Sequence, residues 1–93
     1  MSTYAEKLMN DIKSAMKAGE KERLVTLRSL HAQIKDATVN AGKDMTDEAV
    51  AAVIARQLKQ RLDAATQFKS AGREELAARE EAEMVILREY QPA

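Results

Sequence analysis

Basic side chains at a regular spacing are the feature of this sequence that could do chemistry. Lys21, Arg28 and Lys35 follow one another at seven-residue intervals. In a helix this spacing places all three on one face, because seven residues make almost two full turns. Such a row of cations binds phosphates, since each contact releases counterions condensed on a nucleic-acid backbone. We expect this basic row (Lys21, Arg28 and Lys35) to contact RNA. An ordinary solvated helix face is the competing interpretation.

Further cations could extend such a site. Lys59 and Arg61 lie in the predicted helix that follows, and Arg73 lies at a predicted helix start, where backbone N–H groups help to hold an anion. The aromatic residues fit core positions: Tyr4, Phe68 and Tyr90. With no aromatic left for base stacking, the expected binding is to the backbone and shape of structured RNA.

Catalytic and metal-binding patterns are missing from the sequence. It has no Gly-rich phosphate loop, dinucleotide fingerprint or zinc motif. The one histidine, His31, falls on an apolar stripe, which indicates a half-buried structural residue. Glu80 and Glu83, three residues apart, could share a cation, but a solvated acidic face paired with Arg79 and Arg88 fits them better. We predict no catalytic residue, no metal and no cofactor.

Four amphipathic helices are expected, over residues 4–18, 20–41, 46–71 and 73–90. A Thr–Glu capping box opens the first, and a Thr N-cap with a preceding Met staple opens the third. Glycines or a proline end each helix. The residues concerned are Thr3, Glu6, Gly19, Gly42, Met45, Thr46, Gly72 and Pro92.

Apolar stripes at three- and four-residue spacing define the expected core. In the first three helices the stripes are Tyr4, Leu8, Ile12, Ala15 and Met16; Leu24, Leu27, Leu30, His31, Ile34 and Ala37; and Val50, Val53, Ile54, Gln57, Leu58, Arg61, Leu62, Ala65 and Phe68. The methionines Met9, Met16, Met45 and Met84 are expected to fill the core. The run Met84–Leu87 is apolar on all sides of one turn, so it is either enclosed or packed on a protein partner or a second copy.

Length and composition favour one all-helical domain. The 93 residues include no cysteine, three glycines and one proline, which is too few turn residues for a typical sheet protein. No segment has the length and hydropathy of a membrane span, and residues 1–10 lack the apolar core of a signal peptide. We therefore expect a cytoplasmic protein with no membrane partner.

Several short motifs together resemble the YqeY-like proteins. They are Leu24-Val25-Thr26-Leu27-Arg28-Ser29-Leu30, Lys59-Gln60-Arg61 with Phe68, Ala71-Gly72-Arg73-Glu74-Glu75-Leu76, Glu80-Glu81-Ala82-Glu83, and Tyr90-Gln91-Pro92. The likeness covers nearly the whole chain. Members of this family commonly have Tyr-Leu-Pro at the position where this sequence has Tyr90-Gln91-Pro92.

The resemblance implies a fold and a function. YqeY-like (GatB/YqeY) proteins share a domain with the C-terminal tail of the B subunit of the tRNA-dependent aspartyl/glutamyl amidotransferase. The implied fold is an all-α domain with a four-helix N-terminal part, which this chain matches, and a three-helix C-terminal part that is apparently absent. The family label is carbon–nitrogen ligase activity with glutamine as amido-N-donor. We expect a tRNA-associated accessory domain; the alternative is a helical protein–protein interaction or oligomerisation module.

Overall fold

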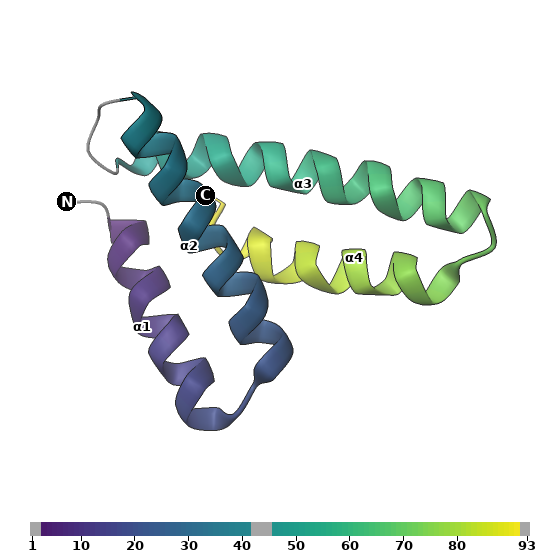
Figure 1. The fold of residues 1–93 in the computed structure, drawn as a ribbon, viewed down its shortest axis with the longest axis horizontal. Helices are drawn as coiled ribbons and strands as arrows, with labels where there is room; N and C mark the ends of the chain where they lie inside the picture. Colours follow the sequence, from purple (N-terminus) through teal and green to yellow (C-terminus); the bar gives the residue numbers. More distant parts are fainter. Residues whose placement is uncertain (1–2, 42–45, 92–93) are drawn as a thin grey trace. The chain divides into compact units, whose positions relative to one another are not determined.

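Four helices make up the chain in the computed structural model, which describes residues 3–41 and 46–91. They are α1 (Thr3–Ala18), α2 (Lys21–Ala41), α3 (Asp47–Ser70) and α4 (Glu74–Arg88) (Figure 1). Each bound lies within two residues of the expected one, and no strand occurs in the described ranges. The all-α prediction is confirmed.

The chain divides into two compact units. The first, Met1–Val53, contains α1, α2 and the beginning of α3, and α1 contacts α2. The second, Ile54–Ala93, contains the rest of α3 and all of α4. Within each unit two consecutive helices form a hairpin (Figure 1). The description of residues 1–93 as one domain stays a prediction.

A glycine ends the first helix of each hairpin, as predicted. Gly19 and Gly72 have φ angles of 70° and 73°, in the left-handed region that residues with a Cβ rarely adopt. After α1, the Glu20 N–H donates to the Ala15 carbonyl at 3.0 Å, and the Gly19 N–H donates to the Met16 carbonyl at 3.3 Å. These two bonds form a Schellman motif, which satisfies carbonyls that the helix end would leave free.

The turn after Gly72 repeats this arrangement. The Arg73 N–H donates to the Phe68 carbonyl at 2.7 Å, and the Gly72 N–H donates to the Lys69 carbonyl at 3.0 Å. At the other end of α3, the Thr46 hydroxyl accepts a hydrogen bond from the Ala49 N–H at 3.1 Å. Thr46 is therefore the N-cap that the sequence predicts. Other predicted boundary features lie outside the described residues: the side chain of Thr3, Gly42, Met45 and Pro92.

The core follows most of the predicted stripes. The buried apolar residues of the first unit are Leu8, Ala15, Leu27, Leu30, Ile34, Val50 and Val53, and those of the second are Ile54, Ala65, Ala77, Met84, Leu87 and Tyr90. His31 is half-buried, as predicted. Burial of aliphatic side chains against neighbouring helices is the main force that holds such small domains together.

Three apolar residues expected in the core are exposed. Met9, Met16 and Leu62 have 42%, 53% and 54% of their surface accessible. The predicted stripe on α1 includes the adjacent residues Ala15 and Met16, which point 100° apart around the helix. Only Ala15 is buried. The same reason applies to Leu62, which follows the half-buried Arg61.

Candidate nucleic-acid interface

The basic row lies on α2, on residues that are all exposed. Lys21, Arg28 and Lys35 are accessible to solvent, while Leu27 and Ile34 between them are 0% and 1% exposed. The two ends of the row, Lys21 and Lys35, are fourteen residues apart on one helix, which corresponds to about 21 Å along its axis. The periodicity that turns the leucines inward thus leaves these cations on the surface.

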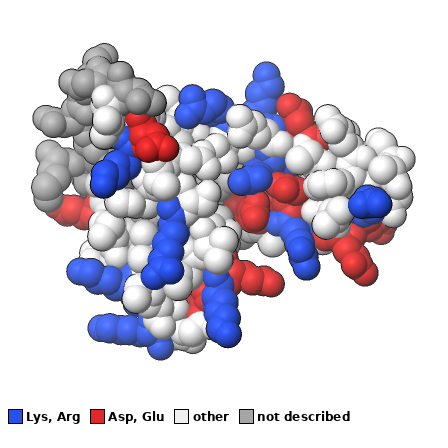
Figure 2. Space-filling model, in the orientation of Figure 1, with Lys and Arg blue, Asp and Glu red and all other residues white. Residues whose placement is uncertain are grey.

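None of the three cations pairs with a carboxylate of the described residues. By contrast, Arg23 on the same helix lies 4.0 Å from Asp11 of α1. Figure 2 shows lysine and arginine side chains spread over the visible face of α1 and α2, with some acidic side chains among them, and the two charges are also mixed on the visible face of α3 and α4. A phosphate approaching the row would not have to displace an acidic side chain.

Within the described residues, Arg28 makes one side-chain hydrogen bond, and it crosses from α2 to α1. Its Nη2 donates to the Sδ of Met16 at 3.6 Å. A thioether sulfur is a weak acceptor, so this contact orients the guanidinium without neutralising it. Its remaining N–H donors keep the planar fork that suits phosphate oxygens.

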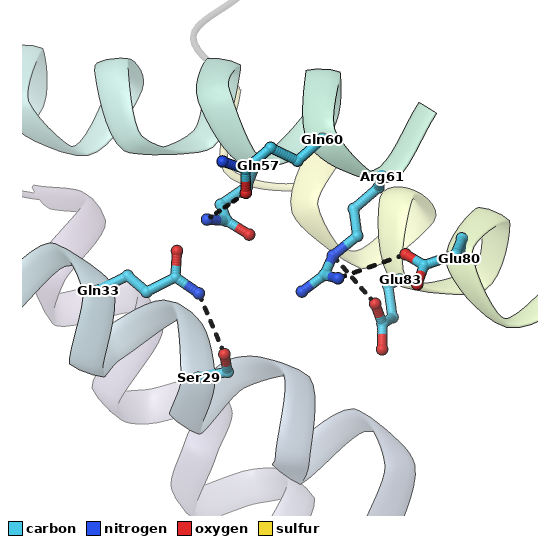
Figure 3. A network of polar contacts seen from close by, with 7 residues as sticks. All are labelled: Ser29, Gln33, Gln57, Gln60, Arg61, Glu80 and Glu83. Atoms are coloured by element: carbon cyan, nitrogen blue, oxygen red, sulfur yellow. Dashed lines mark hydrogen bonds and ion pairs between the residues drawn. The ribbon is translucent and has the colours of Figure 1, made fainter. Parts of the chain in front are cut away.

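Arg61 of the second unit is in a different situation, because two glutamates of α4 hold it. Its Nη1 lies 3.4 Å from Glu80 Oε2 and its Nε lies 3.1 Å from Glu83 Oε2 (Figure 3). The Nε contact lacks hydrogen-bond geometry, so charge attraction maintains it. The side chain of Arg61 is 31% exposed. Its first role is to join α3 to α4, which makes it the weakest candidate for RNA contact.

The remaining candidates, Lys59 and Arg73, are exposed. Lys59 lies on α3, and Arg73 is the N-cap residue of α4, with no side-chain hydrogen bond to the helix start. Both belong to the second unit, as does Arg61. The structure thus groups three candidates on α2 and leaves three on the other hairpin.

Three acidic residues of α4 form ion pairs with basic residues of α3. Glu80 and Glu83 meet at Arg61, and Glu81 Oε1 lies 2.8 Å from Lys69 Nζ. The hydrogen bond and charge of Glu81 raise the pKa of Lys69. Within residues 3–41 and 46–91 no group of three potential metal ligands occurs.

The need of Arg61 for a carboxylate partner could have been inferred from the sequence, although not which carboxylate it meets. Arg61 falls on a predicted buried stripe, and an arginine there needs a carboxylate partner. Glu80 and Glu83, three residues apart, present both of their carboxylates on one side of α4. The contact between Met16 and Arg28 has no comparable sequence signal.

The apolar turn at 84–87 is largely covered by the chain itself. Met84 and Leu87 are 5% and 3% exposed, and Ile86 is half-buried. Val85 alone of the four is exposed, at 61%.

Within residues 3–41 and 46–91, none of the helices has both the length and the hydropathy that a membrane span requires.

Comparison with known proteins identifies the relatives of this chain. Residues 5–93 match the family described as Yqey-like protein. Three curated relatives are named "Altered inheritance of mitochondria protein 41, mitochondrial". The one from Pyrenophora tritici-repentis is 33% identical over 90% of this chain and 46% of its own length. The one from Lachancea thermotolerans is 34% identical over 89% of this chain and 45% of its own length. The one from Kluyveromyces lactis is 33% identical over 92% of this chain and 47% of its own length.

These relatives show how much of their length the chain covers, and they bear on the predicted location. The chain spans about half the length of the curated relatives it matches. All of the relatives are named as mitochondrial proteins, so the prediction of a cytoplasmic location is wrong. That prediction rested on composition and on the first ten residues, and neither determines a compartment.

Proposed function

We propose, from the premise that the chain belongs to the YqeY-like protein family, that it is a tRNA-associated accessory domain. Membership supports a domain like the tail of the amidotransferase B subunit. In this role the chain contacts RNA. The ligase chemistry of the family label, with glutamine as amido-N-donor, is then carried out by other domains. The observation that carries the proposal is the exposed basic row of α2, free of carboxylate partners within the described residues.

The physics of the row supports backbone contact rather than base reading. Lysine and arginine bind phosphates through charge and hydrogen bonds that carry no sequence information. None of the three aromatic residues is exposed, because Tyr4 and Phe68 are half-buried and Tyr90 is buried. A single-strand binder would offer aromatic rings on which bases stack. The proposed ligand is therefore a structured RNA, with Lys59 and Arg73 as secondary contacts.

A titration of the 93-residue chain with tRNA at two salt concentrations tests the proposal. We expect affinity to fall steeply with salt, since each phosphate contact releases counterions. Arg28→Glu should weaken binding at low salt and reduce the slope of log affinity against log salt by about one. Arg79→Glu is the matched control, because Arg79 is exposed on α4 and belongs to no candidate set. The proposal is contradicted if the chain does not bind tRNA at low salt, or if Arg28→Glu and Arg79→Glu lose the same amount of affinity.

A helical interaction module is the second candidate. It is favoured by two large apolar side chains exposed in the second unit, Leu62 at 54% and Val85 at 61%. Sedimentation of the purified chain tests self-association, and Val85→Glu should disrupt it. A chain that remains monomeric and binds tRNA favours the first candidate.

A further inference from the structure

The contact between Arg28 and Met16 joins the centre of the basic row to a side chain that can be oxidised. Met16 is 53% exposed, and its Sδ lies 3.6 Å from Arg28 Nη2. Among the described methionines, Met9 is also exposed, at 42%, but it accepts no hydrogen bond from a described arginine, and Met84 is 5% exposed. Exposure governs access of an oxidant to the sulfur. Met16 thus combines access with direct contact to a phosphate-binding candidate.

We propose that Met16 is a modification site, where oxidation to the sulfoxide by a peroxide masks Arg28 and weakens anion binding by α2. The weakening of RNA binding rests on the proposed function, whereas the masking of Arg28 does not. In the reaction, the thioether sulfur attacks one oxygen of hydrogen peroxide and the O–O bond breaks. A sulfur–oxygen bond forms, and the other oxygen leaves as water after taking up the hydroxyl proton. The sulfur loses two electrons and the peroxide gains them.

The product changes what Arg28 contacts. A thioether sulfur accepts hydrogen bonds weakly, while a sulfoxide oxygen carries a partial negative charge and accepts them strongly. The new oxygen is bonded to the sulfur that Arg28 Nη2 already contacts, so the guanidinium needs only a small rotation to reach it. A phosphate must then compete with an oxygen tethered beside Arg28. Methionine sulfoxide reductases reverse the change, so the masking is reversible.

The masking can be measured on the protein without RNA. Trypsin separates Met9 from Met16, because Met9 falls in the peptide 8–13 and Met16 in the peptide 14–17. After mild treatment with hydrogen peroxide, mass spectrometry gives the oxidised fraction of each. Phenylglyoxal, which modifies arginine, then reports access to Arg28, since a modified Arg28 is not cleaved and yields the peptide 24–35. We expect oxidation to slow the modification of Arg28 at least about twofold.

Two variants separate the role of Met16 from general oxidation. Met16→Leu removes the sulfur and keeps a similar volume, so peroxide should leave the reactivity of Arg28 unchanged. Met9→Leu, the matched control, should behave like the unsubstituted chain. In tRNA titrations, oxidation should weaken binding about three- to tenfold in the unsubstituted chain, with recovery after reductase treatment, and not at all in Met16→Leu.

The outcomes distinguish the two proposals. If Arg28 reacts equally fast before and after oxidation of Met16, or if Met16→Leu responds like the unsubstituted chain, the modification site is refuted. If Arg28 is masked but no form binds tRNA, the modification site is supported and the RNA proposal fails.

Discussion

Replacing Arg61 tests whether this residue is structural. In Arg61→Met, the carboxylates of Glu80 and Glu83 lose their shared cation and remain one helical turn apart. Their side chains are 17% and 35% exposed. Exposed ion pairs contribute about 0–1 kcal/mol, whereas removing one partner of a buried pair costs about 3–5 kcal/mol. The half-buried position of Arg61 lies between these limits, so we expect a loss of about 2 kcal/mol in the free energy of unfolding.

Urea unfolding followed by circular dichroism measures this loss. The triple variant Arg61→Met, Glu80→Gln, Glu83→Gln removes the uncompensated charges, so it should recover part of the stability. Lys69→Met is the comparison for an exposed pair, because Lys69 and Glu81 are 61% and 50% exposed, and its loss should be smaller. The affinity of Arg61→Met for tRNA should match that of the unsubstituted chain.

Two results would refute this reasoning. If Arg61→Met unfolds at the same urea concentration as the unsubstituted chain, the contacts with Glu80 and Glu83 do not stabilise the hairpin. If the triple variant is less stable than Arg61→Met, the loss does not come from uncompensated carboxylates. A tRNA affinity lowered as much as in Arg28→Glu would instead assign Arg61 to the RNA site.

Two further predictions concern the α3–α4 hairpin. Gly72→Ala should lower the free energy of unfolding by about 1–2 kcal/mol, because the φ angle of Gly72 is 73°. No atom lies within 4 Å of an added Cβ, so backbone strain is the only cost of the substitution. An unchanged urea midpoint would contradict this prediction. The pKa of Lys69 is raised above its ordinary value of 10.5 by the hydrogen bond and charge of Glu81. The stabilisation from that pair is therefore complete below the ordinary pKa and is lost as the pH rises through the raised pKa. The urea midpoints of the unsubstituted chain and of Lys69→Met should differ near neutral pH and converge as the pH rises through the raised pKa of Lys69. A gap that stays constant with pH would exclude titration of Lys69 as its cause.

Local sequence signals predict the helices well. Gly19, Gly72 and Thr46 act within a few residues of themselves, through a left-handed φ or a side-chain cap, so each boundary can be inferred without knowing the fold. The same holds for Leu27 and Ile34, whose spacing defines the buried side of α2. The basic row lies away from this buried side, so the same spacing also predicts that the row is exposed.

Contacts between helices are harder to predict. The pairs of Arg61 join residues 19 and 22 positions apart, and helical periodicity does not specify which side chains meet across a hairpin. Met16 shows the limit of pattern reasoning most directly. An apolar residue beside a buried stripe is assigned to the core by its type, although its direction around the helix places it in solvent, where it meets Arg28.

The glycine turn at Gly19 has a consequence for how the chain begins to fold. Because α1 and α2 are joined by a very short connection, their contacts close only small loops, and little chain entropy is lost in forming them. Topologies dominated by such near neighbours fold fast, on the microsecond to millisecond scale. During translation α1 and α2 are synthesised before α3 and α4, and domains generally fold as units in the order of synthesis. We therefore expect the helix that carries the basic row to be paired with α1 while the rest of the chain is still being translated.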